Sequence, residues 1–110
     1  MISSNILRIH ELINSPLVTP YNLLDNIKLD NYNYLVYSKN TQGILCELEC
    51  KMSDDVCKFF YQFDQKDHLI QVTLESLSSG NKKVVFNRQH ELDNEIKKYK
   101  EQKNGISNVI

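Results

Sequence analysis

The sequence has no tryptophan, only three glycines and two prolines among its 110 residues, and almost no net charge, its formal charge being −1. So little glycine and proline excludes collagen-like and linker-rich chains, and 41% hydrophobic with 25% charged residues excludes a disordered one. The length corresponds to one compact domain and excludes a two-domain enzyme. We therefore expect a single α+β domain over residues 1–105, followed by a flexible C-terminal tail over residues 106–110.

The sequence also lacks any stretch close to the ~20 consecutive apolar residues of a membrane helix. Arg8 and His10 interrupt the N-terminal segment before a signal-peptide core could form. We therefore expect a cytoplasmic protein with no membrane partner. Its three cysteines are an odd number, so reduced thiols are expected rather than a disulfide framework.

The small net charge hides an uneven distribution. Residues 46–81 carry three lysines against seven acids, a net charge of −4, whereas residues 82–110 carry seven bases against four acids, a net charge of +3. The molecule as a whole lacks the positive field that would attract nucleic acid or an anionic membrane. The two ends of the fold are nevertheless expected to differ in sign.

Helices are predicted at both ends of the chain. Isoleucines at helical spacing predict an amphipathic helix over Ser3–Asn14, which ends before Pro16; they are Ile2, Ile6, Ile9 and Ile13. Thr19 and Pro20 form a typical helix start, so a short second helix follows. Its expected buried residues are Leu23, Leu24 and Ile27. Near the other end, Asn87 is expected to cap a helix that stops at Gly105.

Between the helices, apolar and polar residues alternate, which is the pattern of half-buried strands. The five predicted strands are Tyr32–Tyr37, Ile44–Met52, 56–64, Leu69–Glu75 and Lys83–Phe86. Their connections are too short to cross a sheet, so successive strands should be antiparallel neighbours. The predicted fold is α+β: an N-terminal helix plus a short second helix, a five-stranded antiparallel β-meander, and a C-terminal helix packed on the sheet.

The cysteines are expected to be core residues. Cys46 and Cys50 lie roughly 13 Å apart along one strand at ~3.3 Å per residue, too far to bind one zinc ion. The sequence allows two registers for the turn between the predicted strands Ile44–Met52 and 56–64. A Ser53-Asp54 loop places Cys50 opposite Cys57, whereas an Asp54-Asp55 loop places Met52 opposite Cys57.

No arrangement of residues predicts an enzyme. The three histidines are scattered, and none stands at a spacing from serine or cysteine that indicates a nucleophile and its base. The isolated glycines form no phosphate-binding loop. Strand aromatics could stack RNA bases, but the neighbouring Glu47 and Glu49 would repel phosphate, which argues against nucleic acid. We therefore predict no catalytic, cofactor-binding or metal-binding residues.

One feature points to a partner. On the face opposite the cysteines, four apolar residues interrupt a polar surface, namely Leu45, Phe60, Leu69 and Val85, and Leu35 and Tyr37 could join them. Either the N-terminal helices cover this face, or the residues form an exposed partner-binding surface. In the second case Phe60 is the expected anchor, because aromatic side chains commonly dominate binding energy.

The leading hypothesis is a small non-catalytic intracellular protein that binds another protein, as an inhibitor, adaptor or chaperone-like factor. It rests on the lack of catalytic and cofactor motifs in so short a chain. The alternative is a small-ligand or nucleic-acid-binding module that uses the sheet aromatics and the C-terminal lysines. An open sheet edge could also join two copies into a homodimer.

Overall fold

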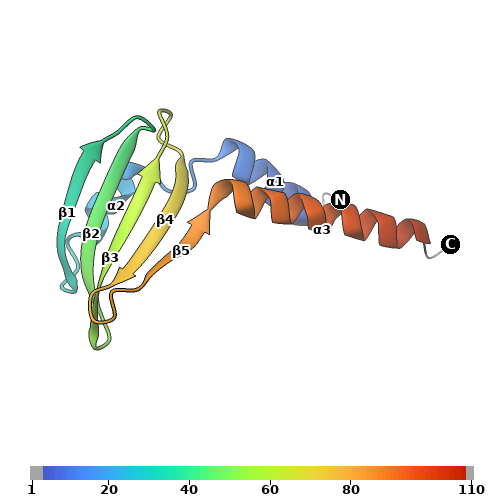
Figure 1. Ribbon diagram of the computed structural model, residues 1–110. Coiled ribbons are helices and arrows are strands. Elements are labelled where there is room, and N and C mark those ends of the chain that lie inside the picture. Colours follow the sequence, from blue (N-terminus) through green and yellow to red (C-terminus); the bar gives the residue numbers. More distant parts are fainter. Residues whose placement is uncertain (1–3, 109–110) are drawn as a thin grey trace.

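The computed structural model describes residues 4–108 and confirms the predicted α+β fold (Figure 1). Its elements are α1 (Ser4–Asn14), η1 (Pro20–Asn22), α2 (Leu23–Asn26), β1 (Tyr32–Lys39), β2 (Ile44–Met52), β3 (Asp55–Phe63), β4 (Leu69–Ser76), β5 (Lys82–Asn87) and α3 (Arg88–Asn108). The strands form one antiparallel sheet in the order β1-β2-β3-β4-β5. No helix in this part of the chain is long and apolar enough to cross a membrane.

The core lies on one face of the sheet, where α2 packs against it. Leu23 of α2 belongs to one buried cluster with side chains from β2, β3 and β4, which are Cys46, Leu48, Cys50, Phe63, Leu69 and Val72. The alternation predicted for Ile44–Met52 therefore places its cysteines inside. The rings of Tyr61 and Phe63 stack along this face with centroids 6.5 Å apart.

The β2–β3 turn adopts the first of the two predicted registers. Met52 pairs with Asp55, so Ser53 and Asp54 form the loop and Cys50 lies directly opposite Cys57. Ser53 has a φ of 54°, the left-handed conformation that such tight turns require. Cys46, Cys50 and Cys57 are all buried and free.

A bulge in β4 overturns one sequence prediction. Gln62 pairs with Gln71 but Phe63 pairs with Leu69, so Ile70 is an extra residue without a partner in β3. One extra residue reverses the alternation of the strand that contains it. Leu69 consequently lies in the core, and its predicted place on the opposite face was wrong.

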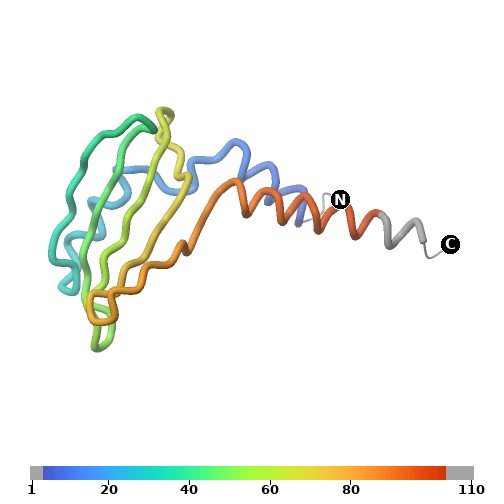
Figure 2. Tube along the Cα trace, in the orientation of Figure 1, coloured from blue at the N-terminus to red at the C-terminus, as the bar shows by residue number. Residues whose placement is uncertain are grey.

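Helices α1 and α3 form an antiparallel pair that projects from the sheet, and Figure 2 shows its two segments side by side. Only the start of α3 packs against the sheet, at β4 and β5. The molecule is accordingly elongated, with extents of 57 × 31 × 26 Å. Asn5, in the first turn of α1, donates to Glu95 of α3 at 2.8 Å and so links the two helices.

The two helices differ from their predictions in detail. Because α3 lies against the side of α1 that carries Asn5 and Leu12, Leu12 is the buried residue and Ile13 is exposed. Ile2 lies outside the described residues. Asn87 caps α3 as predicted, accepting from the backbone N–H of His90 at 2.9 Å. The helix continues through Gly105 to Asn108, so the predicted stop at Gly105 was wrong; residues 109 and 110 lie outside the described residues.

Candidate functional site

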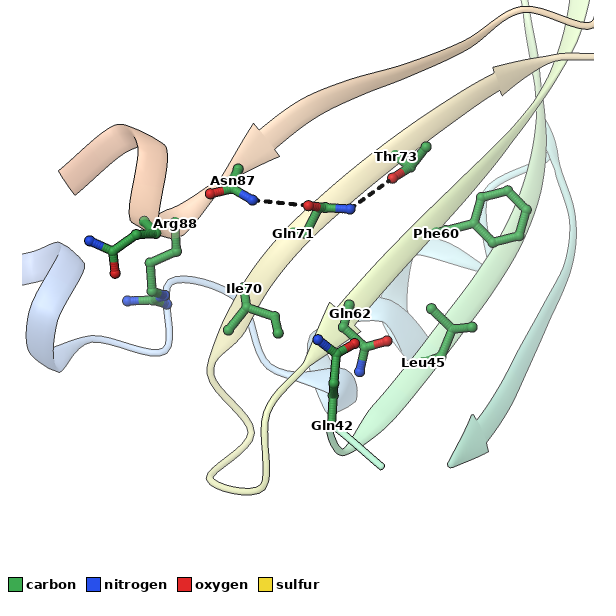
Figure 3. A pocket seen from close by; sticks show the side chains of 10 residues that line it. Gln42, Leu45, Phe60, Gln62, Ile70, Gln71, Thr73, Asn87 and Arg88 are labelled. Carbon is green, nitrogen blue, oxygen red and sulfur yellow. Dashed lines mark hydrogen bonds between the residues drawn. The ribbon is translucent and has the colours of Figure 1, made fainter. Parts of the chain in front are cut away.

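The face opposite the core carries a hollow of ≈ 390 Å³ (Figure 3). Leu45 of β2 and Phe60 of β3 line it, whereas Leu69 is only 5% exposed on the other face. Val85 lies apart, exposed on edge strand β5 as the extra residue of a second bulge. The N-terminal helices do not cover the hollow, because α2 packs on the core face and α1 lies against α3. The structure therefore brings only Leu45 and Phe60 of the predicted surface together, and Leu35 and Tyr37 lie on the core face instead, opposite Leu48 and Cys46.

The polar side chains of the hollow bond mainly within the protein. Gln62 donates to the backbone oxygen of Phe63 at 2.9 Å and accepts from the amide of Asn40 at 2.7 Å. The amide of Asn87 donates to Gln71 at 2.9 Å, and Gln71 donates to the Thr73 hydroxyl at 3.4 Å (Figure 3). The bond between Asn40 and Gln62 ties the β1–β2 turn to β3, and the bond between Asn87 and Gln71 ties β5 to β4. They use donors and acceptors that a ligand would otherwise need, so the hollow is chiefly structural.

A second concavity lies on the core face, at edge strand β1. This apolar groove has a volume of ≈ 550 Å³ and separates η1 and α2 from the C-terminal half of β1. It is lined by Pro20, Tyr21, Leu24, Tyr37, Ser38, Lys39 and Ile44. Tyr21, Leu24 and Tyr37 are 68%, 48% and 40% exposed, although each is a large apolar or aromatic side chain. The apolar groove therefore leaves substantial hydrophobic surface in contact with water.

One hydrogen bond holds the two walls of the apolar groove together. The hydroxyl of Tyr37, on β1, donates to the backbone oxygen of Pro20 at 2.6 Å. Burial raises the pKa of Tyr37, and the neighbouring Cys46 and Tyr21 raise it further. The hydroxyl therefore stays protonated at neutral pH and continues to donate.

The backbone of β1 offers hydrogen-bonding groups beside the apolar groove. Asn40 and Gly43 exchange both backbone hydrogen bonds at the β1–β2 turn, N···O distances being 2.9 and 3.3 Å. Hydrogen-bonded and non-hydrogen-bonded pairs alternate along an antiparallel ladder. The N–H and C=O groups of Leu35, Tyr37 and Lys39 therefore point away from β2. In the described part of the chain β1 has no strand on that side.

The two edges of the sheet differ in how they are protected. Edge strand β5 begins with Lys82 and Lys83 and contains the bulge at Val85, two features that discourage pairing with another chain. Edge strand β1 carries one charged residue, Lys39, at its end, and its bulge at Asn33 lies near its start. The stretch between them, residues 34–38, is uncharged and regular. It is therefore the edge most open to strand pairing.

The apolar groove could not be predicted from the sequence because it depends on where α2 docks. Leu24 was expected to be buried together with Leu23, but only Leu23 faces the core. One signal was present in the sequence: no charge or proline lies between Tyr34 and Ser38. This absence is unusual for an edge strand, but the order of strands had to be known before it had meaning.

The residues invoked for other functions are dispersed. The rings of Phe59 and Tyr61, with centroids 6.4 Å apart, pack along the core face. Beyond its first turns α3 projects away from the sheet (Figure 1), and the C-terminal lysines belong to that later part of the helix, so sheet aromatics and C-terminal lysines do not share a surface. Among residues 4–108, no three histidine, cysteine, aspartate or glutamate side chains cluster closely enough to hold a metal ion.

No family model, no curated protein and no solved structure matches the chain. The interpretation of the site therefore rests on its geometry.

Proposed function

We propose that this protein is a non-catalytic protein-binding module that takes up an extended protein segment as an additional strand along β1. The observation that carries the proposal is the coincidence of two features at one edge. The outward-facing backbone groups of Leu35, Tyr37 and Lys39 lie directly beside the apolar groove. An inhibitor, an adaptor and a chaperone-like factor would all use such a surface.

In this proposal the backbone and the side chains of the incoming segment have different roles, as is common in strand addition. The backbone of the incoming segment would bond to the outward N–H and C=O groups of β1, which supplies affinity without regard to sequence. Every second side chain of the segment would point to the core face and contact Tyr21 and Leu24, whose exposed surface favours large apolar side chains. The proposal therefore includes a preference for segments with alternating apolar residues.

Selection from a library of random displayed peptides tests this function with a defined probe. Peptides enriched on the full chain should be extended and alternate apolar with polar residues. Substituting Leu24→Asp should weaken their binding by about tenfold or more, because a carboxylate then lies in the apolar groove. Leu7→Asp is the matched control, since Leu7 is a 56% exposed leucine on α1 whereas Leu24 is 48% exposed on α2.

Two results would overturn the proposal. The first is a selection that enriches no peptide above an unrelated folded protein. The second is peptide binding that Leu24→Asp and Leu7→Asp affect equally, because binding would then not involve the apolar groove. Circular dichroism of both variants must show the wild-type spectrum, so that loss of folding is not mistaken for loss of binding.

A further inference from the structure

We infer that the strand received at β1 belongs to a second copy of this chain, so that two sheets join through antiparallel β1 strands into one continuous sheet. The inference rests on the proposed function, because it fills the same edge. It adds the identity of the partner. The second copy is favoured because β1 complements itself in its backbone groups and in its side chains.

A two-fold axis beside Val36 is compatible with the outward-facing backbone groups of β1. In this register Leu35 pairs with the partner's Tyr37, and both residues present their N–H and C=O groups toward the other strand. Val36 then faces the partner's Val36 across the axis as a non-hydrogen-bonded pair, the type in which side chains are closest. Val36 is 51% exposed in the single chain, and this pairing covers it.

The same register matches side chains by chemistry. Leu35 and the partner's Tyr37 form an apolar cross-strand pair on the core face, and symmetry makes that pair twice. Lys39 falls near the partner's Asn33 instead of near another lysine, so no like charges oppose each other. The two apolar grooves lie on the same face of the joined sheet, on either side of the axis, where the exposed Tyr21 and Leu24 of each copy approach the partner.

The other edge does not complement itself in this way. The bulge at Val85 interrupts the ladder of β5, and Lys82 and Lys83 place two charges on this edge, which discourages strand pairing. The difference between the edges makes a single, closed dimer through β1 the expected assembly, not an open chain of sheets.

Sedimentation velocity over a range of protein concentrations tests the dimer with the full chain. Wild type should show a concentration-dependent monomer–dimer equilibrium. Val36→Lys places two like charges at the axis and should raise the dissociation constant by about tenfold or more. Val84→Lys on β5 is the matched control, because Val84 is 53% exposed and also lies on an edge strand, and it should leave the equilibrium unchanged.

A cross-linking variant gives a second readout that does not depend on Val36→Lys folding. Non-hydrogen-bonded pairs have Cα atoms about 4.5 Å apart, within the range of a disulfide bond. Val36→Cys should therefore form an interchain disulfide under mild oxidation, whereas Val84→Cys should remain monomeric on a non-reducing gel. The native cysteines are buried in each chain.

The outcomes separate this inference from the proposed function. A monomer at every concentration, without a Val36→Cys disulfide, overturns the dimer; peptide binding that still depends on Leu24 would then leave the proposed function standing. A dimer that Val36→Lys does not weaken also overturns the inference, because copies would associate elsewhere. A β1 dimer that selected peptides dissociate supports both. If the protein forms no dimer and binds no peptide, both the inference and the proposed function are overturned.

Discussion

The guanidinium of Arg88 donates to the backbone oxygen of Leu12 at 2.6 Å, although 76 residues separate them in the chain. The same side chain donates to the backbone oxygens of Pro16 at 3.0 Å and Leu69 at 2.6 Å. One residue at the start of α3 thereby holds the end of α1, the turn that follows it and the start of β4. It is the main polar connection between the helical pair and the sheet.

Replacing Arg88 by methionine should therefore destabilise the protein. Arg88→Met keeps an unbranched side chain but removes all three hydrogen bonds from a charged donor, so we expect a loss of about 2–4 kcal/mol in the free energy of unfolding. Urea denaturation measures it. Arg8→Met is the control, since Arg8 forms an ion pair with Glu11 on the exposed surface of α1, and should cost under about 1 kcal/mol. Equal losses for the two variants would contradict the role given to Arg88.

Gly43 should tolerate no side chain. It has a φ of 150°, and a Cβ atom there would lie 2.4 Å from the backbone oxygen of Phe63, which cannot move without disturbing β3. We expect Gly43→Ala to cost about 3 kcal/mol through backbone overlap and strain. Gly80 has a φ of 71° with nothing within 4 Å of its Cβ position, so Gly80→Ala should cost only about 1 kcal/mol of conformational strain. Thermal or urea unfolding that ranks the two in the opposite order would refute this explanation.

The cysteines should react slowly with thiol reagents, and Cys46 slowest of all. Burial raises the pKa of the Cys46 thiol to about 11 and also raises the pKa values of Cys50 and Cys57. Because the thiolate is the reacting species, both low access and a small thiolate fraction protect these residues. The rate of modification by an aromatic disulfide reagent at pH 8, followed by peptide mapping, measures this order. Modification of Cys46 at the rate of a free thiol would show that this part of the core opens readily.

Asp55 should contribute to stability in a pH-dependent way. A hydrogen bond from the Ser76 hydroxyl lowers the pKa of Asp55, and bonds from Ser78 and Val56 add to it against the opposing effect of desolvation. Because the folded-state pKa lies below the unfolded value of about 3.9, the contribution is complete above that pH. It is lost as the pH falls through the folded-state pKa.

Urea midpoints measured from pH 7 down to pH 3 test this sign. The gap between wild type and Asp55→Asn should be constant near neutrality and shrink below about pH 4, where the carboxyl of the unfolded wild-type chain begins to bind a proton before that of the folded chain does. Asp54→Asn, a change at the exposed neighbouring turn residue, is the control. A gap that stays constant to pH 3 would mean that the charge of Asp55 is irrelevant and only its shape matters.

Phe60 distinguishes between the two candidate binding surfaces. It is half-buried beside the hollow, so Phe60→Ala should cost less than the 3–5 kcal/mol expected, in order of magnitude, for the fully buried Phe63→Ala. If binding occurs along β1, Phe60→Ala should leave both peptide affinity and dimerisation unchanged. A loss of about 2 kcal/mol in binding, with the fold intact, would instead restore the opposite face as the docking surface.

The sheet could be predicted from the sequence because its information is local. The alternation from Ile44 to Met52 determines which side chains of β2 face the core, and short turns determine the strand order. The bulge places Leu69 on the core face where Ile70 was expected, and this change of face could not be predicted in the same way. Both are large aliphatic residues, so nothing local indicates which of them a bulge will turn inward. That single insertion removed Leu69 from the predicted binding surface.

The candidate site was less predictable because it depends on docking between distant segments. The exposure of Leu24 follows from the orientation of a four-residue helix on the sheet, and the exposure of Ile13 follows from the side of α1 that α3 contacts. Hydrophobic periodicity marks a helix face as apolar but does not say how much of that face a partner covers. The apolar groove exists because part of the apolar surface of α2 and β1 is left uncovered.

The contact between α1 and α3 has a consequence for biosynthesis. The meander can form strand by strand as the chain leaves the ribosome, since each strand pairs with the one made just before it. Helix α1 must wait through the synthesis of all five strands before Arg88 and the rest of α3 appear. During that interval Leu12 lacks the surface that later buries it, so α1 can dock only after all five strands and the start of α3 have been made.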